Sequence, residues 1–301
     1  MDVLNQTINL PILSDKNISL CIKREDKLHP FISGNKYRKL KYNLQEAKKQ
    51  NASCLLTFGG AYSNHIAATA FAGKENGIKI IGVIRGEELA TKWQDNPTLT
   101  FAHKNGMEFE FVSREAYRDK ENPKFLNRFK EKYSNAFILP EGGANALGVK
   151  GCEEILTPKD ANFDLICCAV GTGGTIAGII NAAQSHQKVL GFPALKGDFL
   201  NEDIRKFVRN KNWKLQTDYH FGGYAKINEE LIHFINEFKN NTGVQLDPIY
   251  TGKMLFGIFD MIKTNKIVEG SSILAIHTGG LQGIKGMNTL LKKKNLPIID
   301  A

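Results

Sequence analysis

Residues 165–175 read LICCAVGTGGT, an apolar run followed directly by a glycine-rich turn. The run Leu165–Val170 favours a buried strand, and the sequence after Gly174 favours a helix. Glycines in such a turn let backbone N–H groups point toward an anion, and the helix N-terminus adds partial positive charge. Residues 171–175 therefore predict a cup for a single phosphate group, with a plain strand-to-helix turn as the alternative.

This turn departs from two familiar nucleotide-binding patterns. The dinucleotide fingerprint needs a glycine where Ile176 stands, and the turn lacks the Gly-Lys-Ser/Thr ending of an ATP-binding loop. A nicotinamide-dependent dehydrogenase with an unusual loop is therefore only a minor alternative.

Strand-like apolar runs alternate with helix patterns along the whole chain. The expected strands are residues 54–58, 78–84, 109–112, 136–139, 165–170, 188–192, 217–221 and 273–277. The expected helices cover residues 64–76 and 228–240, open at Asn96-Pro97 and Asn122-Pro123, follow Gly174, and lie near 201–209. Such alternation is typical of α/β proteins whose parallel sheets carry helices on both faces.

The number of these units predicts two open, twisted parallel-sheet domains rather than one. Residues 43–145 would form the smaller domain. Residues 1–42 and 146–301 would form the larger, with a strand at Ile18–Arg24. No Pro- or Ser-rich linker is visible, so we expect the halves to pack around a cleft that holds the active site. Ligands of open α/β sheets lie beyond the carboxyl ends of the strands, which directs attention to the residues that follow each strand.

Composition narrows the class of protein. Of 301 residues, 42% are hydrophobic and 24% are charged, which excludes a disordered or collagen-like chain. No apolar run approaches about 18 residues and no signal peptide is visible, so we expect a cytoplasmic protein without a membrane partner. The net charge is +9, but the cations are dispersed, which favours an anionic ligand over nucleic acid. Five scattered cysteines without a Cys-x-x-Cys pair predict reduced thiols and no metal site.

A second glycine turn, Gly59–His65, follows an expected strand and opens a helix. Ser63 and Asn64 are typical helix caps, so plain capping is one interpretation. The free N–H groups at that helix start would also suit a carboxylate. Two anion sites of this kind predict a ligand with a phosphate at one end and a carboxylate at the other.

Lys36 is the candidate nucleophile. It follows the Ser-Gly-Asn turn at residues 33–35 and stands at the start of an expected helix. The neighbouring cations Arg38 and Lys39 favour the neutral, nucleophilic amine.

Six motifs, in order along nearly the whole chain, resemble the fold type II pyridoxal-phosphate enzymes, whose fold is tryptophan synthase β-like. The resemblance is narrowest to the branch that holds D-cysteine desulfhydrase and 1-aminocyclopropane-1-carboxylate deaminase. The motifs are IKRED at 22–26, GNK and RKL within 34–40, SNH at 63–65, GGANALG at 142–148, DPIYTGK at 247–253 and IHTGG at 276–280.

The resemblance implies pyridoxal 5′-phosphate as cofactor, a small amino acid as substrate and a homodimer. Lys36 would hold the cofactor covalently and move the Cα proton, and Asn64 would bond the 3′ oxygen of the cofactor. Four residues would bind its phosphate: Thr172, Gly173, Gly174 and Thr175.

The remaining implied roles concern the substrate. Ser63, Asn64 and His65 would hold the substrate carboxylate, with Thr278 as a further substrate contact. Tyr250 and Tyr224 match the active-site tyrosines of the branch, and Tyr224 matches less closely because Ala225 stands where glycine is expected.

Two positions depart from the deaminase pattern, which has Glu after the late tyrosine and Leu after the late histidine. Here these positions are Thr251 and Thr278. A carboxylate that faces the pyridine nitrogen strengthens the electron sink, whereas a threonine hydroxyl can face an unprotonated nitrogen. Because cyclopropane opening needs the stronger sink, we expect β-elimination from D-cysteine. Cyclopropane deaminase, another pyridoxal-phosphate dehydratase or racemase, and a non-catalytic binding protein are the alternatives.

Overall fold

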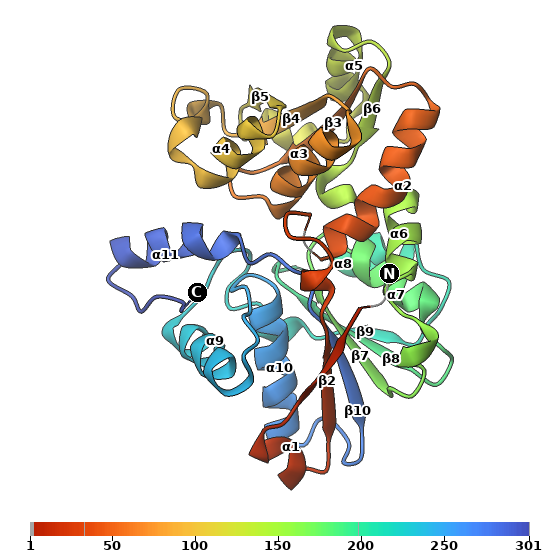
Figure 1. Cartoon of the computed structure of the whole chain (residues 1–301), viewed down its shortest axis with the longest axis vertical. Coiled ribbons are helices and arrows are strands. Elements are labelled where there is room, and N and C mark those ends of the chain that lie inside the picture. Colours follow the sequence, from red (N-terminus) through yellow and green to blue (C-terminus); the bar gives the residue numbers. More distant parts are fainter. Residues whose placement is uncertain (1–2, 33, 198, 301) are drawn as a thin grey trace. The chain divides into compact units, whose positions relative to one another are not determined.

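The computed structural model describes residues 3–32, 34–197 and 199–300, and its chain divides into two compact units (Figure 1). Unit 1 comprises residues 1–29, 33–35 and 152–301, and unit 2 comprises residues 30–32 and 36–151. These boundaries differ from the expected 42/43 and 145/146. The difference arises at two helices, α2 (Asn35–Lys49) and α6 (Ala146–Glu153), because most of each belongs to unit 2.

Unit 1 contains a six-stranded sheet in the order β1-β2-β10-β7-β8-β9. The strands are β1 (Asn5–Ile8), β2 (Ser19–Lys23), β7 (Leu165–Val170), β8 (Lys188–Pro193), β9 (Trp213–Leu215) and β10 (Ser272–Ile276). All neighbouring strands are parallel except β1, which pairs antiparallel with β2. The sequence pattern does not predict this edge strand, because its polar sequence NQTI lacks the apolar run of a buried strand.

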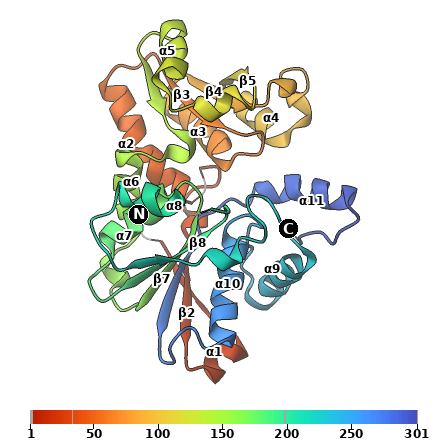
Figure 2. The ribbon, with the colours of Figure 1, turned by 180° about the vertical axis from the view of Figure 1, so that it is seen from behind.

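Helices cover both faces of this sheet, as the alternation predicts (Figures 1 and 2). They are α1 (Pro11–Asp15), α7 (Gly174–Ala182), α8 (Phe199–Arg205), α9 (Glu229–Thr242), α10 (Thr251–Lys263) and α11 (Gly283–Lys293). One core joins α9, α10 and α11 to the sheet, and a second core joins α7 and α8 to its other face. Strand β7 is apolar throughout because it sends Cys167 and Ala169 into the first core and Ile166 and Cys168 into the second.

Unit 2 contains a four-stranded parallel sheet in the order β5-β4-β3-β6. Its strands are β3 (Cys54–Gly59), β4 (Ile80–Arg85), β5 (Met107–Val112) and β6 (Ala136–Leu139). Its further helices are α3 (Asn64–Asn76), α4 (Pro97–Lys104) and α5 (Pro123–Lys132). The expected caps are confirmed: Asn96 Oδ1 accepts from the N–H groups of Thr98 and Leu99, and Asn122 Oδ1 accepts from that of Lys124.

One expected strand is wrong. Residues 217–219 form a 3₁₀ turn, and the edge strand lies earlier, at Trp213–Leu215. Phe221 and Gly222 have φ angles of 54° and 89°, in the left-handed region, which no strand can accommodate. The other 3₁₀ turns span Glu25–Lys27, Glu87–Leu89, Trp93–Asp95, Ala116–Asp119, Glu141–Gly143 and Pro158–Asp160.

Neither a membrane span nor a metal cluster occurs in the part of the chain that the structure describes. No helix there is both long and apolar enough to cross a bilayer. No three His, Cys, Asp or Glu side chains among those residues gather as ligands for a metal ion.

Candidate functional site

The glycine turn between β7 and α7 leaves the backbone N–H groups of a helix start without a side-chain cap. Gly173 is the N-cap residue of α7 with φ 81°, and no side chain caps the helix. The first N–H groups of α7 are therefore open to an anion. A Cβ at Gly173 would lie 2.9 Å from Ile204 Cγ1, so glycine is required there by both conformation and space.

The segment that precedes Lys36 is fixed to this turn within unit 1. Asn35 Nδ2 donates to Thr175 Oγ1 at 2.7 Å, and the backbone N–H of Asn35 donates to the carbonyl oxygen of Thr278 at 3.3 Å. An added Cβ at Gly34 would lie 2.0 Å from that same oxygen. Ser33, the first residue of the predicted turn, lies outside the described residues. The residues directly before Lys36 therefore contact both the Thr175 hydroxyl and the Thr278 backbone.

The start of α10 is organised by one buried carboxylate, that of Asp247. Its Oδ2 accepts from the N–H groups of Ile249 and Tyr250, and its Oδ1 accepts from the N–H and the hydroxyl of Thr251, all at 2.7–3.0 Å. The Thr251 hydroxyl also accepts from the Asp247 N–H at 2.9 Å. A hydroxyl has one proton, so Thr251 can donate to a ring nitrogen only if its bond to Asp247 breaks.

The two predicted tyrosines meet beside the glycine turn. The rings of Tyr224 and Tyr250 lie 6.3 Å apart between centroids, at 63° to one another. A Cβ at Gly171 would lie 3.2 Å from Tyr250 Cε1, so this ring covers the first glycine of the turn. Unit 1 therefore brings together the predicted phosphate loop, Tyr250 and Tyr224.

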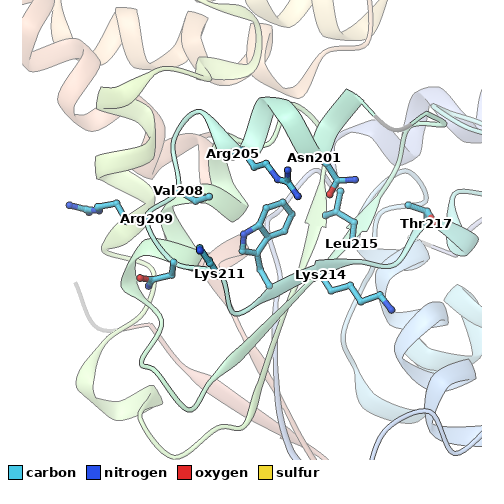
Figure 3. A pocket seen from close by; sticks show the side chains of 10 residues that line it. Asn201, Arg205, Val208, Arg209, Lys211, Lys214, Leu215 and Thr217 are labelled. Atoms are coloured by element: carbon cyan, nitrogen blue, oxygen red, sulfur yellow. The ribbon is translucent and has the colours of Figure 1, made fainter.

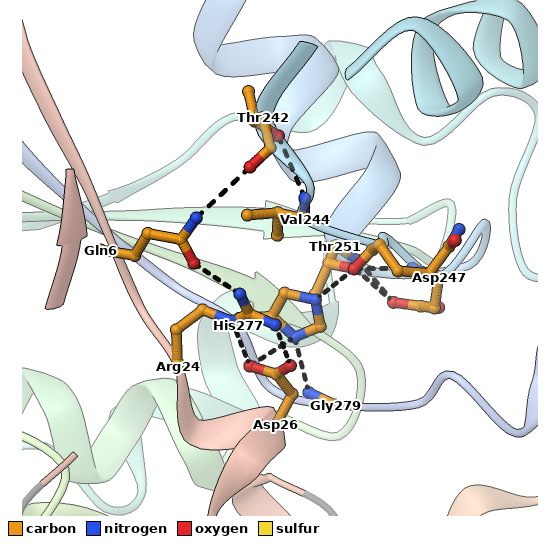
Figure 4. A network of polar contacts seen from close by, with 10 residues as sticks. Gln6, Arg24, Asp26, Thr242, Val244, Asp247, Thr251, His277 and Gly279 are labelled. Atoms are coloured by element: carbon orange, nitrogen blue, oxygen red, sulfur yellow. Dashed lines mark hydrogen bonds and ion pairs between the residues drawn. The ribbon is translucent and has the colours of Figure 1, made fainter. Parts of the chain in front are cut away.

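A buried polar network supports the loop that carries Thr278 (Figure 4). Arg24 forms a two-pronged ion pair with Asp26, at 2.9 and 2.7 Å, and donates to Gln6 Oε1 at 2.6 Å. His277 Nδ1 accepts from the Gly279 N–H at 3.2 Å and lies 3.6 Å from Asp26 Oδ1, and His277 Nε2 faces the Gln245 carbonyl oxygen at 2.7 Å. The network fixes the backbone on both sides of Thr278.

Unit 2 carries the second predicted anion site at the start of α3. Ser63 is the N-cap residue, and its Oγ accepts from the Ile66 N–H at 3.3 Å. Capping is thus confirmed, and it leaves the Ser63 hydroxyl proton for another acceptor. Asn64 and His65 are the first two helical residues, and the N–H groups at these positions have no partner within the helix.

His65 is buried and uses its ring inside unit 2. Thr57 Oγ1 donates to Leu139 O at 3.0 Å, so it accepts the proton of His65 Nε2, 2.7 Å away. Thr69 Oγ1 lies 3.5 Å from His65 Nδ1. Burial, with smaller contributions from Lys36 and Lys39, holds the pKa of His65 well below its usual range. His65 is therefore neutral and structural, and can offer an anion only its backbone N–H.

Sequence reasoning missed two buried charged residues at the start of α10, Asp247 and Lys253, although both stand in the motif at residues 247–253. Asp247 precedes Thr251 by four residues, a spacing that suits a cap of the helix start. Lys253 is a cation in the otherwise apolar first turns of α10, where a solvated residue is not expected. A polar residue within an apolar helix face was the available signal for Lys253.

A separate pocket of about 810 Å³ lies in unit 1 between α8 and β9 (Figure 3). Trp213 lies among the exposed cations Arg205, Lys211 and Lys214 there. None of the predicted site residues lines this pocket, so the predicted chemistry belongs elsewhere.

The donors at the start of α7 fit a phosphate group, because the first backbone N–H groups of that helix have no intrahelical partner. Within unit 2, Lys36 at the start of α2 carries an amine of the kind that condenses with a carbonyl group.

Comparisons with known proteins agree with this chemistry. The profile of the family described as pyridoxal-phosphate dependent enzyme matches residues 5–279. A putative 1-aminocyclopropane-1-carboxylate deaminase of Pyrococcus furiosus is 33% identical over 289 residues, covering 87% of this chain and 84% of that protein. The mitochondrial bifunctional D-cysteine desulfhydrase/1-aminocyclopropane-1-carboxylate deaminase of Arabidopsis thaliana is 33% identical over 305 residues, covering 92% of this chain and 75% of that protein.

A solved crystal structure of an ACC deaminase homologue has the same architecture. It superposes with a TM-score of 0.83 at 28% identity and covers 97% of this chain and 94% of that chain. The match extends through both sheets, and the family profile spans the glycine turn, Lys36 and the start of α10. The chain therefore belongs to the family of pyridoxal-phosphate dependent enzymes.

Proposed function

We propose that the protein is a lyase that converts D-cysteine and water to pyruvate, hydrogen sulfide and ammonia. When bound, pyridoxal phosphate withdraws electrons from the substrate Cα. The chain itself must hold the cofactor and substrate, remove the Cα proton and assist the departing sulfur.

Lys36 is the proposed base. Its neutral amine takes the Cα proton, after which the Cβ–S bond breaks and its electron pair leaves with sulfur. The positive charge of neighbouring Arg38 and Lys39 favours the neutral amine.

The start of α3 is the proposed carboxylate site. The Ser63 hydroxyl proton and the N–H groups of Asn64 and His65 are the donors, and Asn64 also bonds the 3′ oxygen of the cofactor. Thr172–Thr175 hold the phosphate, and Thr278 is the further substrate contact. The open amides at the start of α7 support the phosphate assignment.

Tyr250 is the proposed proton donor to sulfur, with Ser63 as the other candidate and Tyr224 as its neighbour. The Tyr250 ring lies against Gly171, and Tyr224 packs on Tyr250. Proton donation from a phenol to the departing thiolate lowers the barrier to breaking the Cβ–S bond. The enamine product then reacts with water, which yields pyruvate and ammonia.

The observation that carries the choice of D-cysteine is the neutral side chain at the start of α10. Thr251 is fully buried and donates to Asp247, so this position supplies no carboxylate to a pyridine nitrogen. A weaker electron sink suits elimination of a good leaving group better than opening of a carbon ring.

The cyclopropane deaminase is the second candidate, because the Pyrococcus relative is described as a putative enzyme of this activity and the Arabidopsis relative as a bifunctional one. The test is 2-oxo acid formation by the cofactor-loaded protein from D-cysteine, L-cysteine and 1-aminocyclopropane-1-carboxylate, each offered alone. Pyruvate from D-cysteine alone supports the proposal. 2-Oxobutyrate from the cyclopropane compound instead would show that position 251 does not discriminate the two reactions.

We further propose a cytoplasmic homodimer. None of the five cysteines forms a disulfide in the structure, and four of them are buried, which suits a reducing compartment. Light scattering after size-exclusion chromatography tests the dimer, which a mass near that of one chain would contradict.

A further inference from the structure

Lys253 is a buried cation held by two backbone carbonyl groups. It lies in the first turn of α10 with 1% of its surface exposed. Its Nζ donates to His220 O and to Gly223 O, both at 2.8 Å. Both acceptors belong to one loop, residues 220–225, so a single side chain fastens that loop to α10.

The charge of Lys253 has little compensation. Burial lowers the pKa of Lys253 to about 8, and the nearby negative charge of Asp247 opposes this shift. A buried ammonium is costly unless its protons find acceptors, and here two carbonyl oxygens supply them. Lysines are rarely fully buried. Because the Lys253 ammonium donates to carbonyl oxygens of the loop 220–225, its burial stabilises that loop.

The loop has a backbone that needs support. Phe221, Gly222, Gly223 and Ala225 have φ angles of 54°, 89°, 118° and 56°. For the two residues with a Cβ, Phe221 and Ala225, the left-handed region is strained. Within the loop, the Gly222 N–H donates to His220 Nδ1 at 2.9 Å and the Gly223 N–H donates to His220 O at 3.0 Å. The Phe221 ring packs on Phe256 of α10, 4.9 Å between centroids.

Tyr224 stands in the middle of this loop, directly after the Gly223 carbonyl that Lys253 binds. Its ring meets Tyr250, whose backbone N–H is held by Asp247. The two tyrosines are therefore fixed by two buried, oppositely charged groups near the start of the same helix.

We propose that Lys253 is a positioning residue, whose ammonium clamps the loop 220–225 to α10 and thereby sets Tyr224 against Tyr250. The catalytic consequence rests on the proposed function, whereas the clamp itself does not.

Hydrogen exchange of the cofactor-loaded protein without substrate tests the clamp. Lys253→Met removes the donors and keeps a long apolar chain. Lys263→Met, at an exposed position on the same helix, is the matched control. We expect exchange of the 221–226 amides to rise at least tenfold in Lys253→Met only, while the middle of α10 stays protected. Unchanged exchange in the loop would overturn the proposal.

The wild-type protein provides a test that does not depend on a variant folding. In protein labelled with nitrogen-15 lysine, the Nζ protons of Lys253 should exchange slowly, and its Nζ should show hydrogen-bond couplings to the carbonyl carbons of His220 and Gly223. If Lys253 shows neither property at pH 6, the clamp does not exist.

Kinetics then separate a positioning role from a general loss of stability. If Lys253 acts through Tyr224, Lys253→Met and Tyr224→Phe each lower kcat about tenfold, and the double variant is no worse than the worse single variant. If the losses of kcat in the two single variants multiply in the double variant, Lys253 does not act through Tyr224. If the wild type turns over no amino acid, the proposed function fails while the exchange result still decides the clamp.

Discussion

Gly34 lies so close to the carbonyl oxygen of Thr278 that a Cβ added to it would be 2.0 Å from that oxygen. Gly34 also has φ 60°, in the left-handed region. We expect Gly34→Ala to lower the free energy of unfolding by several kcal/mol, because backbone atoms on both sides must move.

Gly77→Ala is the matched control for this substitution. Gly77 has φ 64°, but a Cβ there would meet nothing within 4 Å. Gly77→Ala should therefore lower the free energy of unfolding by only about 1 kcal/mol, from backbone strain alone. Urea denaturation measures both variants, and equal losses would show that the contact between Gly34 and Thr278 is unimportant.

Lys36→Ala should abolish the visible absorbance of the cofactor-loaded protein and its turnover, because the proposed covalent link needs the Lys36 amine. Lys49→Ala, exposed at the end of the same helix, should leave both unchanged. Retention of the visible band and of activity in Lys36→Ala would refute the assignment.

Thr251→Val should lower the free energy of unfolding by about 1–3 kcal/mol, because the Asp247 N–H and carboxylate each lose a buried partner. Thr251→Ser keeps the hydroxyl and should lose less than half as much. Thermal or urea denaturation measures the free energy of unfolding of both variants. Equal losses would mean that the hydroxyl group of Thr251 contributes no more to stability than its methyl group.

His65 should make stability depend on pH below neutrality. Its pKa is lowered in the folded state, so as pH falls through about 6.5 the unfolded chain binds a proton that the folded chain does not. The contribution of neutral His65 to the free energy of unfolding is complete above pH 6.5. Below that pH it decreases by at most about 1.4 kcal/mol per pH unit.

Comparison of wild type with His65→Gln isolates this effect, and exposed His233→Gln is the control. Denaturation between pH 7 and pH 5 should show a steeper loss for wild type and His233→Gln than for His65→Gln. Parallel curves for all three proteins would mean that His65 titrates normally.

The sequence is most informative where burial alone determines an element. Strand β7 and the turn after it are predictable from residues 165–175, because a strand buried on both faces must be apolar throughout. The caps Asn96 and Asn122 are equally predictable, since capping needs only local residues.

Features that depend on distant partners are not predictable in this way. The strand expected at residues 217–221 is wrong because the loop after Tyr219 is held in left-handed conformations by contacts with α10, 30 or more residues away. The Thr251 hydroxyl is expected from its motif to face a cofactor, but its orientation toward Asp247 emerges only from the fold of the helix start.

The order of strands in the larger sheet has a consequence for synthesis of the chain. Strand β2 pairs with β10, and unit 2 is encoded between them. A ribosome that adds about 5–20 residues per second needs roughly 12 to 50 seconds to travel from one strand to the other. During that interval unit 2 can complete its own sheet. Leu20 and Ile22 of β2 cannot pair with β10 until that strand is synthesised near the end of translation.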